Sequence, residues 1–141
     1  MRRSYPWLEF AVSPAEPPIP DPSGNRMYFE PVPPQAAPER KRKLLRRDLL
    51  TSIAAAARAI AKAQPEVVLG QGQGAVVSAA LARPRMLEVA LASKTVSPEE
   101  AVALAAAWGE VKVVLVVAPR VSVRPLRAEE VCEAAPELAW D

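Results

Sequence analysis

The sequence predicts a small α/β domain in which a small parallel sheet is joined by helical crossovers and preceded by a proline-rich extended arm. Three observations support this prediction. Ten of the sixteen prolines fall within residues 1–38, a long stretch with helical apolar spacing follows, and two apolar β-branched runs at 66–69 and 111–119 are separated by helical segments. A chain of 141 residues has the length for one hydrophobic core. We therefore divide it into an arm, 1–38, and a small α/β domain, 39–141.

The arm is predicted to be extended because proline fixes φ and has no backbone N–H. It also holds five of the seven aromatic residues, in "YPWLEF" and "RMYFEP", with "DPSGN" at 21–25 as a turn between them. Because a merely solvated tail is poor in aromatic residues, we expect the two clusters to dock on this domain or on a partner. The candidate docking residues are Trp7, Phe10, Tyr28 and Phe29.

A helix is predicted over residues 39–63 because its apolar residues recur at spacings of three and four. Its start, "RKRKLLRR", is strongly basic, and residues 40–63 carry eight cations against one acid. Cations at a helix N-terminus oppose the helix dipole, so we expect them to serve binding rather than helix stability. The predicted anion-binding residues are Arg40, Lys41, Arg42, Lys43, Arg46 and Arg47. Nucleic acid, an anionic lipid surface or an acidic protein fits them, and a solvated charge run is the plain alternative.

Gln64 and Pro65 are predicted to end this helix, and "EVVL" at 66–69 to form a short buried strand. Three helical pieces follow, at 75–83, 84–93 and 97–109, the first two separated by Pro84. In the third piece, Ser97 is the predicted N-cap and Glu100 the other half of a capping box.

The run "VKVVLVVAP" at 111–119 is apolar on both faces, which predicts a central parallel strand covered by helices. A last helix is expected near 127–135. Two strands are too few for a free-standing sheet. We therefore expect the arm or another chain to complete the sheet.

The glycine-rich loop between the first strand and the next helix is the candidate ligand loop, formed by Gly70, Gln71, Gly72, Gln73 and Gly74. It fits the dinucleotide pattern G-x-G-x-x-G/A, yet the acid expected about 20 residues later, at the end of a second strand, is missing. The plain alternative is structural, because glycines let a strand turn sharply into a helix.

The segment 66–121, with "VVLGQGQGAVVSAALA" followed by "WGEVKVVLVVAPRV", resembles the strand, elbow and helix of the α/β-hydrolase family. In that family the elbow carries a nucleophilic serine in G-x-S-x-G. Here Gly72 stands at the nucleophile position, and the chain has no histidine to act as base. The resemblance therefore implies an inactive hydrolase-like domain.

The lack of histidine removes the usual general base and the commonest metal ligand. The single cysteine, Cys132, excludes an internal disulfide, and its glutamate neighbours make a catalytic thiol unfavourable. We predict no catalytic residue, metal or cofactor. No apolar run approaches the ~20 residues of a membrane span, so an intracellular location, cytoplasmic or nuclear, is expected.

These observations predict a non-catalytic interaction or assembly subunit. It would dock on a protein partner, or on copies of itself, through the aromatic arm and the basic helix, with nucleic acid as a candidate partner of that helix. The alternative is a small-ligand domain, binding a nucleotide or phosphate, or an inactive hydrolase-like domain, that uses the loop at 70–74.

Overall fold

The computed structural model describes residues 19–20, 26–27, 35–71, 73–117 and 133–138. Two short strands, β1 (Ile19–Pro20) and β2 (Arg26–Met27), come first. The domain then runs α1 (Pro38–Ala63), β3 (Val67–Gln71), α2 (Gln73–Leu81), α3 (Pro84–Leu91), α4 (Pro98–Gly109), β4 (Val113–Val117) and the 3-10 helix η1 (Pro136–Leu138). The predicted order of a helix, a strand, three helices and a strand is confirmed.

The sheet of the domain is a parallel pair, β3 and β4, in register from Val67 opposite Val113 to Gln71 opposite Val117. The three helices α2, α3 and α4 form the connection between the two strands. The predicted mixed α/β class with a small parallel sheet is therefore correct.

Little of the arm belongs to the described residues. β1 and β2 pair antiparallel, with Ile19 opposite Met27, which brings the two flanks of the predicted turn together. Residues 21–25 of that turn and the rest of 1–34 lie outside the described residues.

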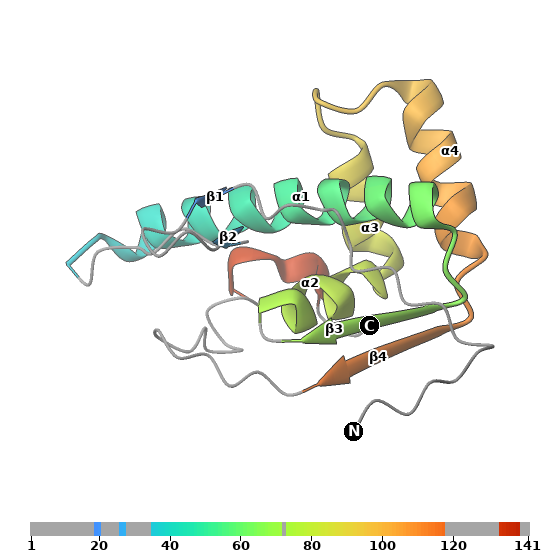
Figure 1. The fold of residues 1–141 in the computed structure, drawn as a ribbon. Coiled ribbons are helices and arrows are strands. Elements are labelled where there is room, and N and C mark those ends of the chain that lie inside the picture. The colour runs from blue at the N-terminus through green and yellow to red at the C-terminus, as the bar shows by residue number, and fades with distance from the viewer. Residues whose placement is uncertain (1–18, 21–25, 28–34, 72, 118–132, 139–141) are drawn as a thin grey trace.

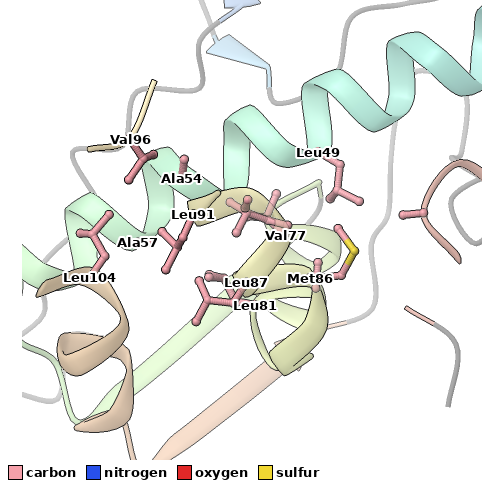
Figure 2. Close-up of a cluster of buried hydrophobic side chains, with 14 of the residues drawn as sticks. Leu49, Ala54, Ala57, Val77, Leu81, Met86, Leu87, Leu91, Val96 and Leu104 are labelled. Atoms are coloured by element: carbon pink, nitrogen blue, oxygen red, sulfur yellow. The ribbon is translucent and has the colours of Figure 1, made fainter. Parts of the chain in front are cut away.

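The core lies between α1 and the sheet. In Figure 1, α1 runs along the domain, α2 lies between it and the two strands, and α4 stands against the C-terminal half of α1. Figure 2 shows side chains from α1, α2, α3 and α4 meeting in one cluster. Most of them are alanine, valine and leucine, so small side chains let the helices approach closely. The largest fully buried side chains are Leu49, Ile53, Leu81, Met86 and Ser52.

The helix ends follow local sequence signals. α1 ends at Gln64, whose backbone takes the left-handed conformation (φ 50°) and whose N–H donates to the Ile60 carbonyl at 2.8 Å. α4 begins after Ser97, whose hydroxyl accepts a hydrogen bond from the Glu100 N–H at 3.1 Å. The predicted N-cap is confirmed, and the Glu100 carboxylate reaches across to Arg58 of α1.

The predicted burial of both strands is wrong. Val113 and Leu115 of β4 are 44% and 51% exposed, and Val67 and Leu69 of β3 are 50% and 56% exposed. The reason is that α2 is the one described helix that packs on the strands. It leaves one face of the two-stranded sheet open and covers the other only in part, since Val116, opposite Gly70, is also 50% exposed.

The predicted C-terminal helix at 127–135 is described only at its end, where residues 133–134 are helical before η1 begins at Pro136. The rest of that prediction lies outside the described residues. Within the described part of the chain, no helix is long and apolar enough to cross a membrane.

Candidate functional site

The N-terminal end of α1 carries the predicted cation cluster, and the structure divides that cluster in two. Arg40, Lys41, Arg42 and Lys43 form the part that we call the basic end. Arg40, Arg42 and Lys43 are exposed and Lys41 is partly exposed. Burial along α1 starts only at Leu45, so the basic end precedes the part of the helix that packs on the core.

Arg46 belongs to an internal ion pair instead. Its two terminal nitrogens, Nη1 and Nη2, donate to the Glu137 carboxylate at 2.8 and 2.6 Å, and Nη1 also lies 3.4 Å from the Ala134 carbonyl oxygen. This two-point hydrogen bond, helped by the charge of Arg85, lowers the pKa of Glu137 to about 2. Arg46 therefore holds the C-terminal turn of the described chain against α1.

Arg47 is also engaged within the chain. Its Nε and Nη2 donate to Oδ1 of the neighbouring Asp48 at 3.0 and 2.9 Å, and the Asp48 side chain is only 7% exposed. A buried carboxylate needs such a partner. Two of the six predicted anion-binding residues, Arg46 and Arg47, thus pair with carboxylates of this domain. Among the described residues, no ion pair involves the four cations of the basic end.

A second surface was not predicted from the sequence. Along each strand, alternate residues point to the side of the sheet away from α2, and five aliphatic side chains line that side. We call it the exposed sheet face, and it consists of Val67, Leu69, Val113, Leu115 and Val117. Each of the five is between 44% and 56% exposed. The sequence analysis used the number of strands only to predict that the sheet is completed by further strands. It did not draw the other consequence, that two strands and one covering helix leave an apolar face in contact with solvent.

The predicted ligand loop starts at a point of close packing. Gly70 is buried in β3, and a Cβ atom placed on it would lie 2.6 Å from the Gly74 carbonyl oxygen and 2.7 Å from Ser78 Cβ. Glycine is therefore required at position 70 so that α2 can pack against the strand. This agrees with the structural alternative for the loop, in which its glycines let the strand turn sharply into a helix. Gly72 and the side chain of Gln73 lie outside the described residues, and the ligand-binding interpretation stays a prediction.

The four aromatic residues predicted to dock, Trp7, Phe10, Tyr28 and Phe29, also lie outside the described residues, as does Cys132. Among the residues that the structure does describe, no group of three or more acidic or cysteine side chains is placed to hold a metal ion.

Comparison of this chain with family models, curated proteins and solved structures returns no match. The resemblance of segment 66–121 to the α/β-hydrolase elbow therefore remains a prediction from the sequence.

Proposed function

We propose that this chain is a non-catalytic interaction or assembly subunit that docks on a protein partner or on further copies of itself. The observation that carries the proposal is the exposed sheet face. The sequence supports the non-catalytic part, since the chain has no histidine and Gly72 stands where the hydrolase-like elbow would need a nucleophile.

The exposed sheet face is unfavourable in water. Parallel sheets are usually covered on both faces, and a two-stranded sheet is marginal by itself. Because its five side chains are already about half buried, covering each one completely contributes roughly 1 kcal/mol. A protein surface that covered all five would therefore gain several kcal/mol.

The strand edges offer a second means of docking. Among the described residues, β3 and β4 pair only with each other, so each strand has an outer edge. Between Val113 and Val117, β4 contains no charge and no proline, the residues that commonly protect an edge from pairing. A strand of the partner could therefore add to this edge while its side chains cover the exposed sheet face.

The exposed sheet face is too small to hold a free partner unaided. Association costs on the order of 4–15 kcal/mol before any net affinity appears, which is similar to or larger than the gain from five half-buried side chains. We therefore propose that the arm, through Trp7, Phe10, Tyr28 and Phe29, supplies further contacts to the protein partner, while the basic end of α1 contacts a separate anionic surface. Both contacts follow from the sequence predictions.

Substitution of the exposed sheet face tests the proposal. Leu69 and Leu115 lie directly opposite each other, so the pair Leu69→Lys and Leu115→Glu places opposite charges on neighbouring strands and avoids repulsion between like charges. We expect the wild-type chain to form complexes above monomer mass in light scattering. The double variant should lose them while still unfolding cooperatively, with a Tm lowered only as far as the loss of two half-buried leucines requires.

The matched control is Val102→Lys, which places a charge at a 72% exposed aliphatic residue of α4, away from the sheet. It should leave the complexes intact. A wild-type chain that is monomeric at all concentrations, and that recovers no partner from cell extract, would refute the proposed function.

A further inference from the structure

The cations of the basic end point in all directions around α1. Successive residues of an α-helix are 100° apart because a turn holds 3.6 residues. The four consecutive cations from Arg40 to Lys43 therefore surround the helix instead of lining one face. A ligand that binds all four must offer negative charge on more than one side of the helix.

The basic end is also accessible. Residues 38–44 precede Leu45, the first buried residue of α1. At 1.5 Å per residue they form about 10 Å of helix ahead of the core. In Figure 1 this end of α1 extends past α2 and the sheet.

Its charge is not neutralised within the described part of the chain. No ion pair there involves Arg40, Lys41, Arg42 or Lys43, whereas Arg46 and Arg47 are paired with Glu137 and Asp48. Glu39 is the one acid in the first turn of α1. The positive N-terminal end of the helix dipole adds to the repulsion among the cations, so a bound anion would relieve an unfavourable arrangement.

We propose that the basic end binds the phosphate backbone of double-stranded DNA by entering its major groove, without reading the sequence. The groove is about 12 Å wide and admits an α-helix with its side chains. Phosphates then lie on both sides of the helix, which matches cations that surround it. This proposal identifies the anionic partner of α1, which the proposed function leaves open. It rests on the proposed function only in assuming that α1 contacts a partner.

Other polyanions fit the geometry less well. A lipid surface would bind a helix with an apolar face, and residues 38–43, "PERKRK", contain no aliphatic side chain apart from proline. Single-stranded nucleic acid is usually held by aromatic stacking, and residues 38–43 contain no aromatic residue. The major groove of an RNA duplex is too narrow for side chains to read. A flat acidic protein surface would contact only one side of the helix.

The test is the binding of the full chain to a labelled DNA duplex of arbitrary sequence, measured by fluorescence anisotropy at several salt concentrations. Four phosphate contacts predict a log–log slope of about −3.6, and therefore a loss of roughly 100-fold in affinity between 50 and 200 mM salt. The triple variant Arg40→Gln, Arg42→Gln and Lys43→Gln should lose at least tenfold in affinity at 50 mM salt, and its slope should fall to about −1.

The matched control removes the same charge elsewhere, at the exposed residues Lys62, Lys94 and Lys112, each replaced by glutamine. It should stay within about threefold of the wild-type affinity, because the proposed contact uses only the basic end. The exposed ion pair of Lys112 with Glu66, which this control removes, contributes little to stability. The sheet variant Leu69→Lys with Leu115→Glu should bind DNA as the wild type does, which separates this proposal from the proposed function.

Four results would overturn the proposal. The first is no binding at 50 mM salt, and the second is an equal loss in the control triple variant. The third is binding of single-stranded DNA or duplex RNA as tight as that of duplex DNA. The fourth is binding of polyglutamate but not of DNA, which would assign the basic end to an acidic protein.

Discussion

The guanidinium of Arg46 meets the carboxylate of Glu137 through two hydrogen bonds, of 2.8 and 2.6 Å, although the two residues are 91 positions apart in the chain. The pair attaches η1 to α1. It also removes one cation from the cluster at the start of α1, so the charge available to a partner is restricted to the basic end.

Breaking this pair should destabilise the C-terminal turn. In Glu137→Gln the charge is lost while the shape is kept, and we expect the free energy of unfolding at pH 7 to fall by about 1 kcal/mol, since the pair is partly exposed to solvent. Chemical denaturation checks this value. Glu133→Gln, an exposed glutamate four residues earlier, is the control and should have no measurable effect.

The same pair predicts a pH dependence. The folded-state pKa of Glu137 is lowered to about 2, below its ordinary value of 4.5, chiefly by the hydrogen bonds from Arg46. The stabilisation is therefore complete above pH 4.5 and is lost as the pH falls toward 2. Tm measured from pH 6 to pH 2 should fall more steeply for the wild type than for Glu137→Gln. Parallel curves would show that Glu137 does not titrate in this way.

Gly70 should not tolerate a side chain. A Cβ at this position would meet the Gly74 carbonyl oxygen at 2.6 Å and Ser78 Cβ at 2.7 Å, so Gly70→Ala must separate α2 from β3. We expect a loss of about 1–3 kcal/mol, measured by chemical denaturation. At Gly109, by contrast, a Cβ meets nothing within 4 Å. Gly109→Ala should therefore be neutral or slightly stabilising, and an equal loss in both variants would contradict the packing argument.

The N-cap of α4 provides a local test. Ser97→Ala removes the acceptor of the Glu100 N–H and should cost about 1 kcal/mol of stability. Ser97→Asp keeps an acceptor at the cap and should retain most of the wild-type stability. If both variants melt together with the wild type, the cap contributes nothing in this context.

Local signals made most helix boundaries predictable from the sequence. Pro84 begins and Ser97 precedes a helix that was expected there, because proline and capping residues act on the adjacent backbone alone. Pro38, which the sequence analysis assigned to the arm, instead begins α1. The parallel pairing of β3 and β4 was predictable because helical segments separate them, which leaves room for a crossover.

The candidate surfaces depended on longer-range contacts. The pairing of Arg46 with Glu137 follows from how η1 folds back on α1, which no local pattern encodes. The exposure of Leu69 and Leu115 depends on how many strands and helices cover the sheet. An apolar run such as that of β4 is expected both in a central strand and in a strand that is covered on one face only. The sequence could not distinguish the two cases, and the predicted burial of β4 was wrong.

The central claim is that a partner protein, or another copy of this chain, covers the exposed sheet face when the chain performs its function. The most direct measurement is the mass of the complex that contains the tagged chain, recovered from its native cells and measured by light scattering at low and high salt. An apolar contact predicts a mass well above 15.2 kDa at both salt concentrations, because salt screens charges and not apolar burial. A monomer of 15.2 kDa at both concentrations would contradict the claim.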